Sequence, residues 1–466
     1  MRDGFVHPYV PNAAPAARRK LLEAIGADDV ADLYAAIPEA LRVQGLLDLP
    51  PALPGEHDLR RHLEEIVSRN RPCTGTWLNF CGAGCAQHYV PAIVDEIVHR
   101  GELLTAYGGG TYSDHGKNQA LFEFQSLMGE LVGMEVVSTP TYDSGAATGS
   151  AAMMACRITG RRGVLVPETM SADKRAQLRG FTKPFATVGT VARDPATGGT
   201  DLADLRARVS GETAAVVIES PGYLGLIETE AAQIADIAHE AGALLIAGVD
   251  PISLGVLAAP ADYGADLVVG DLQPLGIHMY AGGGNGGFIA SRDEARFVAE
   301  YPSILFSIAP TGGGNSSGFG FGWSTMERTS YDTRHDATDY TGTTQWIWGI
   351  GAAVYLSLMG PDGMAEIGRG IMQRARFAAE RIAGLPGVSV PHLERPFFKE
   401  FVVDFSGTGR TVAAINGALL AAEIHGGKDL SGEFPALGQS ALYCVTEMHG
   451  AADIERLVSA LGEAVR

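Results

Sequence analysis

Short apolar runs alternate with amphipathic stretches through the middle of the chain. The apolar runs predict strands at 163–167, 214–220, 243–248, 266–270 and 286–290. The amphipathic stretches predict helices around 144–158, 171–179, 201–209 and 230–241. Strands that are apolar throughout are covered on both faces, and helical connections join parallel strands. The pattern therefore predicts an α/β fold built on a mostly parallel sheet.

Helical and strand patterns also mark the two ends of the chain. Segment 118–132 places Leu121, Phe124, Met128 and Leu131 on one face, which predicts a helix that packs against the core. The last third predicts a long helix at about 345–384, strands at 397–405 and 441–447, and helices at 411–424 and 451–465. The first 75 residues predict short helices at 17–26 and 28–37 and a proline-rich linker at 49–58.

These elements predict three parts along the chain. They are an N-terminal helical segment at 1–75, a large domain at 76–340, and a connecting helix with a small C-terminal α/β domain at 341–466. A large parallel-sheet lobe followed by a small terminal lobe is typical of pyridoxal-phosphate enzymes of the aminotransferase type (fold type I). We therefore expect an aminotransferase-like fold.

The net charge and the lengths of the apolar runs exclude some classes of binding partner. The 466 residues carry a formal net charge of -19, which opposes binding to nucleic acid and to anionic membranes. The longest apolar runs fall far short of the roughly 20 residues that a membrane helix needs. No apolar segment of a signal peptide follows the first charged residues, so we expect a cytoplasmic protein.

The five cysteines are too few and too irregularly spaced for a disulfide framework. Cys81 and Cys85 have a spacing that resembles a metal site, but no second pair of ligands accompanies them. We therefore expect buried thiols and no metal.

A small-residue segment after the first part of the large domain is suited to an anion. Residues 142–155, "YDSGAATGSAAMMA", begin a predicted helix at Asp143, Ser144 and Gly145. The N–H groups and the dipole at a helix N-terminus favour a phosphate. A turn in which Asp143 or Ser144 caps the helix explains the same residues, and both interpretations stay open.

Asp250 follows the strand predicted at 243–248. In pyridoxal-phosphate enzymes, a carboxylate at such a position pairs with the protonated pyridine nitrogen. The alternative is an aspartate that forms a turn before Pro251.

The Schiff-base lysine that this chemistry requires is missing. It is expected about twenty residues after the aspartate, just beyond the next strand. Gln273 stands there, and no lysine occurs between Lys183 and Lys399. Because an amide cannot form an imine, we predict that this chain holds no covalent cofactor.

The chain resembles subunit 1 of the two-subunit glycine dehydrogenase (decarboxylating), the P-protein of the glycine cleavage system. The resemblance covers nearly the whole chain and rests on segments 9–42, 88–107, 119–136, 263–276, 355–364 and 397–403. It implies a heterodimer or heterotetramer with a lysine-bearing subunit 2 that holds the pyridoxal phosphate. It also implies that glycine is decarboxylated and that its aminomethyl group passes to the lipoyl H-protein.

Three loops expected near the shared site depart from the family pattern. Tyr107 is followed by "GGGTYSDHGKN" instead of a stretch close to "TPYQPEISQGT", and 281–290 and 334–347 differ as well. We expect Tyr107, His115 and Arg334 to lie at the shared site. His115, beside Asp114 and Lys117, is either a proton-transfer group or part of a polar surface loop.

The altered loops leave two other functions open. The first is a heterodimer subunit that decarboxylates another small amino acid. The second is a non-catalytic homodimer that binds an amino acid or a phosphate without turnover.

Overall fold

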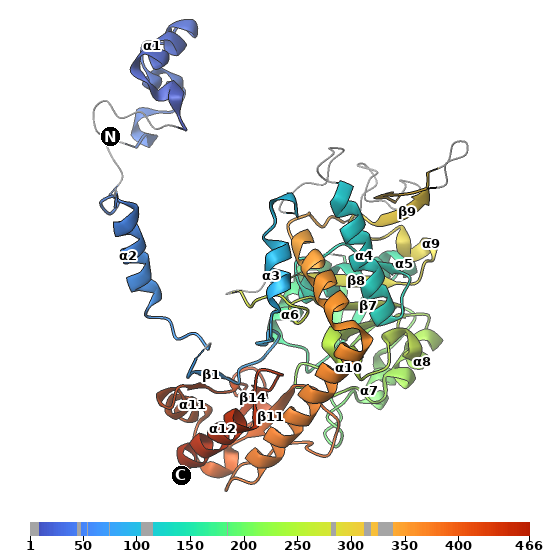
Figure 1. Ribbon diagram of the computed structural model, residues 1–466. Coiled ribbons are helices and arrows are strands. Elements are labelled where there is room, and N and C mark those ends of the chain that lie inside the picture. The colour runs from blue at the N-terminus through green and yellow to red at the C-terminus, as the bar shows by residue number, and fades with distance from the viewer. Residues whose placement is uncertain are drawn as a thin grey trace. The chain divides into compact units, whose positions relative to one another are not determined.

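The computed structural model describes residues 9–43, 48–53, 55–73, 75–103, 115–183, 185–280, 286–311, 318–324 and 339–466, without the side chains of Pro11 and His115. Figure 1 shows the chain from end to end. It forms two compact units, Met1–Arg71 and Pro72–Arg466. In the described part of the chain, no helix is long and apolar enough to cross a bilayer.

The first unit consists of short helices, and none of its described side chains is buried. It contains α1 (Pro15–Ala24), α2 (Glu56–Val67) and the 3-10 turns η1 (Pro11–Ala13), η2 (Val30–Tyr34) and η3 (Glu39–Leu41). Neither α1 nor α2 has a buried residue. The helix predicted at 28–37 is wrong, because only a 3-10 turn capped by Asp29 forms there. The linker predicted at 49–58 is too long, since α2 begins at Glu56.

The second unit is built on a seven-stranded sheet of order β2-β8-β7-β6-β5-β3-β4. The strands are β2 (Val136–Val137), β3 (Gly163–Pro167), β4 (Thr187–Val191), β5 (Thr213–Glu219), β6 (Leu244–Val249), β7 (Leu267–Asp271) and β8 (Gly287–Ser291). β3 to β7 run parallel, and β8 and β2 add an antiparallel edge. The predicted α/β class, its mostly parallel sheet and all five predicted strands are confirmed.

Helices cover both faces of this sheet, as the apolar strands require. One face packs against α5 (Ser144–Thr159), α6 (Ala172–Thr182) and α9 (Ala295–Val298). The other packs against α3 (Ala92–Val98), α4 (His115–Val132), α7 (Leu202–Arg208), α8 (Ala231–Glu240) and part of α10. Along β6, Leu245 and Ala247 join the second core and Ile246 joins the first, because successive side chains point to opposite faces.

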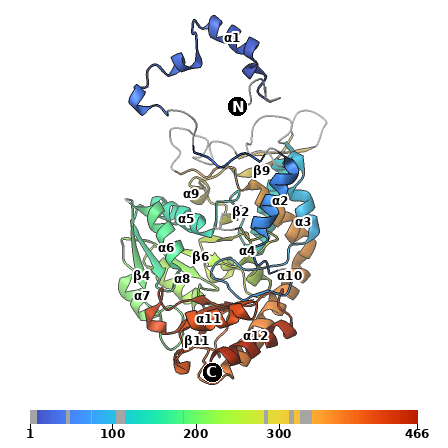
Figure 2. The same cartoon turned by 90° about the vertical axis from the view of Figure 1, so that its left-hand side faces the viewer.

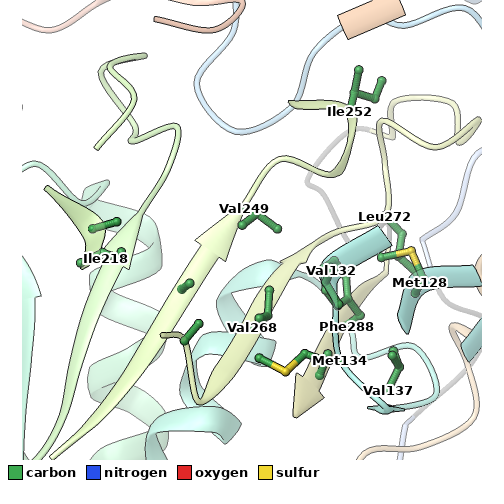
Figure 3. Close-up of a cluster of buried hydrophobic side chains, with 14 of the residues drawn as sticks. Met128, Val132, Met134, Val137, Ile218, Val249, Ile252, Val268, Leu272 and Phe288 are labelled. Carbon is green, nitrogen blue, oxygen red and sulfur yellow. The ribbon is translucent and has the colours of Figure 1, made fainter. Parts of the chain in front are cut away.

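The core beneath α4 explains its predicted inner face. Met128 and Val132 of α4 are fully buried with Val268 of β7 and Phe288 of β8 in one cluster. Figure 3 shows this cluster beside the end of β6. Each such side chain stabilises the fold by about 1.5–3 kcal/mol. This packed core lies beside the end of β6, which Asp250 follows.

The long predicted helix is α10 (Trp346–Ala383), but it is not continuous. Gly360 has non-helical angles (φ 58°, ψ -177°) and precedes Pro361, so two helical segments meet at a kink. A proline within a helix lacks the N–H that the ladder needs, which accounts for the break.

A small C-terminal lobe follows α10. Its sheet has the order β11-β14-β13, with β11 (Glu400–Asp404), β13 (Lys428–Asp429) and β14 (Ser440–Cys444). Figure 2 shows α11 (Val412–Ala421) and α12 (Ala451–Ala464) beside β11. β1 (Leu78–Asn79) pairs with β12 (Ile424–His425), which joins an early segment to this lobe. The domain boundaries at residues 75 and 340 stay predictions.

Shorter elements complete the unit. They are η4 (Gly101–Leu103), η6 (Pro251–Gly255), η7 (Pro260–Tyr263), β9 (Phe306–Pro310), β10 (Phe319–Trp323), η8 (Ser406–Thr408) and η9 (Pro435–Leu437).

Candidate functional site

A cavity of about 370 Å³ lies at the carboxyl ends of β5, β6 and β7. In open parallel sheets, this edge is where ligands bind. Residues of both lobes line it, including Asp143, Ser144, Gly145, Lys174, Glu219, Asp250, Asp271, Lys399 and Glu400. The structure thus brings four of the predicted residues, Asp143, Ser144, Gly145 and Asp250, to one cavity.

Asp250 is paired with a lysine from the small lobe. It follows β6, and its Oδ1 accepts a hydrogen bond from the N–H of Ile252 at 2.9 Å. Its Oδ2 forms an ion pair with Nζ of Lys399, and both side chains are only 10% exposed. Burial lowers the pKa of Lys399, but the charge of the nearby Asp250 raises it by a larger amount, so the net shift is upward. Asp250 therefore caps the turn before Pro251 and also lines the cavity.

The ion pair extends to a buried histidine. Nζ of Lys399 lies 3.3 Å from Nε2 of His88, and Nδ1 of His88 lies 2.9 Å from Oε2 of Glu447. An ammonium group can only donate, so Nε2 of His88 accepts and Nδ1 carries the proton that faces Glu447. Lys399 has φ 46°, a left-handed conformation that is rare outside glycine. The local backbone is therefore strained where the lysine enters the cavity.

The start of α5 is already occupied by carboxylates of this chain. Oδ1 of Asp143 accepts a hydrogen bond from the N–H of Ala146 at 2.7 Å. Asp271 accepts from the N–H of Gln273 at 3.0 Å and also from the N–H of Ser144. Burial raises the pKa of Asp271 to about 6, and the charge of Asp143 contributes. An anion placed there would meet two negative groups.

Gln273 does not line the cavity, and its side chain hydrogen-bonds to two backbone segments. It is 1% exposed. Its Nε2 donates to the carbonyls of Ala86 and Ile277, each at 3.0 Å, and its Oε1 accepts from the N–H of Ala86 at 3.3 Å. Both ends of the amide are thus satisfied within the protein.

Lys174 and Glu219 form a second ion pair across the cavity. Nζ of Lys174 lies 2.6 Å from Oε1 of Glu219, whose side chain is 8% exposed. Burial lowers the pKa of Lys174, but Glu219, Asp271 and Asp143 together raise it. One ammonium group therefore serves three carboxylates.

Glu400 completes the acidic lining from the small lobe. Its Oε1 accepts from the N–H of Ala83 at 2.5 Å. A Cβ on Gly82 would lie 2.1 Å from that oxygen, so only glycine lets the carboxylate reach the loop. Burial raises the pKa of Glu400, and the charges of Asp250 and Glu219 add to that effect, whereas Lys399 and the N–H of Ala83 oppose it.

The remaining predicted site residues lie wholly or partly outside the described residues, or differ from expectation. Tyr107 and Arg334 lie outside the described residues, and His115 is the first residue of α4 with its side chain outside them. Cys81 and Cys85 are half-buried and form no disulfide, and Cys85 lines the cavity, so the expectation that both thiols are buried is wrong. In the described part of the chain, no three His, Cys, Asp or Glu side chains could hold a metal ion.

These contacts do not fit pyridoxal phosphate. The cofactor requires a lysine for the imine, a carboxylate open to its ring nitrogen, and N–H groups open to its phosphate. Here Asp250 is already paired with Lys399, the first N–H groups of α5 bond to Asp143 and Asp271, and no lysine other than Lys174 and Lys399 lines the cavity in the described part of the chain.

Sequence reasoning missed the cavity residues that follow no motif. Lys174, Glu219 and Glu400 come from three separate elements, and Lys399 lies 149 positions after Asp250. For Glu219 alone, the sequence offered a signal, because a polar residue at the end of an apolar strand often lies at a ligand site.

Comparisons with known proteins agree on one protein family. The family profile described as "Glycine cleavage system P-protein" matches residues 7–461. A probable glycine dehydrogenase (decarboxylating) subunit 1 of Staphylothermus marinus is 33% identical over 98% of both chains. The protein of the same name from Aeropyrum pernix is 36% identical, again over 98% of both chains.

Solved structures agree in fold. A crystal structure of glycine decarboxylase (P-protein) of the glycine cleavage system, in inhibitor-bound form, has a TM-score of 0.85 and 32% identity, covering 99% of this chain and 100% of that one. The sphingosine-1-phosphate lyase of Burkholderia pseudomallei has a TM-score of 0.64 at 17% identity, covering 92% of this chain and 94% of that one. The expected aminotransferase-like architecture, fold type I, is confirmed.

Proposed function

Because this chain belongs to the glycine cleavage system P-protein family, we propose that it is the subunit of a glycine dehydrogenase (decarboxylating) that carries no Schiff-base lysine. A lysine-bearing subunit 2 holds the pyridoxal phosphate, which supplies the electron sink for decarboxylation when bound. The complex decarboxylates glycine and passes the aminomethyl group to the lipoyl H-protein. We place the complex in the cytoplasm.

The buried Gln273 carries the proposal. Its amide stands where the lysine is expected and is fixed by three hydrogen bonds to Ala86 and Ile277. The pairing of Asp250 with Lys399 supports the same conclusion, since that carboxylate already has its cation. The chain therefore contributes to the shared site by its loops, where we place Tyr107, His115 and Arg334.

The first unit supports the need for a partner. The apolar stripe of α2, formed by Leu59, Leu63, Ile66 and Val67, is between 44% and 59% exposed. Exposed apolar surfaces of this kind mark contacts between proteins. We propose that subunit 2 covers this stripe.

The test is to co-express the chain with its lysine-bearing homologue and to measure exchange of labelled carbon dioxide into the carboxyl group of glycine. We expect exchange with the complex and the H-protein, and none with either subunit alone. Full exchange by the lysine-bearing subunit alone would refute the proposal.

The altered segments 107–118, 281–290 and 334–347 favour a second candidate, a complex that decarboxylates another small amino acid. Release of carbon dioxide from another amino acid, faster than from glycine, would select it. A stable homodimer that does not bind the lysine-bearing homologue would instead favour a non-catalytic binding protein.

A further inference from the structure

The cavity between the two lobes is short of positive charge. Six carboxylates and two lysines line it, which gives a formal charge of -4. Both ammonium groups are already committed, Lys399 to Asp250 and Lys174 to Oε1 of Glu219. Of the four remaining carboxylates, Asp143, Asp271 and Glu400 accept hydrogen bonds from backbone N–H groups, and within the described residues they form no direct ion pair.

Like charges face one another inside this cavity. Asp143 raises the pKa of Asp271, which burial already raises to about 6. Glu219 and Asp250 act in the same direction on Glu400, whose pKa burial also raises. A bound cation would relieve this repulsion, whereas an anion such as phosphate would increase it.

Glu219 supplies an independent sign of a missing ligand. Its side chain is 8% exposed and lines the cavity. Within the described residues, its Oε2 is buried and has no hydrogen-bond partner, although Oε1 bonds to Lys174. A buried carboxylate oxygen without a donor is destabilising, so an ammonium donor there would be stabilising.

The lining also limits the kind of cation. No three ligating side chains gather closely enough for a metal ion in the described part of the chain. The volume of about 370 Å³ exceeds what a single atomic ion fills. Pro221, Val249 and Pro274 provide apolar walls that suit methylene groups.

We propose that this cavity binds a small organic ammonium ion of net positive charge, which pairs with the carboxylate of Glu219. The ligand takes the part of the cleft between the Asp250–Lys399 pair and the start of α5. A zwitterionic amino acid is disfavoured, because its carboxylate would enter a cavity of formal charge -4. The proposal goes beyond the activity above and does not rest on it.

The test is isothermal titration of the full chain with the linear diamine putrescine, at low and high salt. Glu219→Gln keeps the shape of the side chain and removes its charge. Asp271→Asn keeps an acceptor for the N–H of Gln273. Glu240→Gln, on the exposed end of α8, is the matched control.

We expect saturable 1:1 binding that weakens about tenfold to a hundredfold in the Glu219→Gln variant and remains unchanged in the Glu240→Gln variant. Binding should also weaken in the Asp271→Asn variant. If circular dichroism shows that the Glu219→Gln variant is unfolded, the Asp271→Asn variant alone tests the proposal. Binding by both cavity variants with the affinity of the wild-type chain would overturn the proposal, since the diamine would then bind elsewhere.

Three further outcomes would also overturn it. They are a dissociation constant for putrescine weaker than about 1 mM, tighter binding of glycine or pyridoxal phosphate than of putrescine, and binding of magnesium that depends on Glu219. None of these measurements uses the activity of the complex, so the result stands apart from the proposed function.

Discussion

Replacing Lys399 by methionine should destabilise the chain through Asp250. Methionine keeps most of the apolar stem of the side chain and removes its charge. Asp250 would then be a buried carboxylate, 10% exposed, without its cation. His88 would also lose the donor at its Nε2.

The expected loss follows from the burial of the pair. Removing one partner of a buried ion pair costs about 3–5 kcal/mol. Unfolding of the unit Pro72–Arg466, about 395 residues, carries an entropy of about 0.8 kcal/mol/K at about 2.1 cal/mol/K per residue. The melting temperature of the Lys399→Met variant should therefore fall by about 4–6 °C.

A double-mutant cycle isolates the ion pair from other effects. Asp250→Asn keeps the oxygen that accepts from the N–H of Ile252, so the 3-10 turn η6 stays capped. The Asp250→Asn/Lys399→Met double variant has no buried charge at this point, and we expect it to regain most of the lost stability. Calorimetric melting of the four proteins measures the coupling.

The outcome of this cycle decides whether the ion pair accounts for the loss of stability. A double variant as unstable as the Lys399→Met variant would refute the reasoning.

Three other changes test separate parts of the account. Asp271→Asn removes a carboxylate whose pKa is raised to about 6. Because the folded state retains that proton as pH rises past the unfolded pKa, the wild-type chain loses stability between these two values and does not regain it at higher pH. In urea unfolding, the variant should therefore be more stable than the wild-type chain by up to about 2 kcal/mol at pH 7, and equally stable at pH 4. Gln273→Lys loses the acceptor for the N–H of Ala86 and should cost about 1–3 kcal/mol, and mass spectrometry after borohydride reduction should find no pyridoxyl adduct in the lone chain. Leu59→Ser in α2 should weaken binding of the lysine-bearing subunit in ultracentrifugation by about tenfold, whereas Arg61→Ser on the same helix should not.

Elements with strong periodicity were predictable from the sequence, and those without it were not. β5 and β6 are apolar throughout because both faces are covered, and this pattern identified them. β4, "TVGTV", is an edge strand with only Val191 buried, so its alternation of small and polar residues gave little signal. The kink at Gly360 was visible as a glycine before a proline, but the long apolar pattern on both sides favoured one helix.

The candidate site was predictable only where it follows local sequence. Asp143 and Asp250 could be identified because each one follows an irregular segment or strand and caps the next element. Lys399 could not be identified, because only the packing of the small lobe against the large one brings it to Asp250. The glutamine at position 273 was visible in the sequence, but the pairing of Lys399 with Asp250 was not.

The central claim is that the partner subunit, and not this chain, holds the cofactor. The most direct measurement is to add pyridoxal phosphate to this chain, to the lysine-bearing subunit and to their complex, reduce each with borohydride, and locate the pyridoxyl group by peptide mass spectrometry. The account predicts a modified lysine in the partner alone, with this chain unmodified at stoichiometric cofactor. A pyridoxyl group on Lys174 or Lys399 of this chain at full occupancy would contradict it.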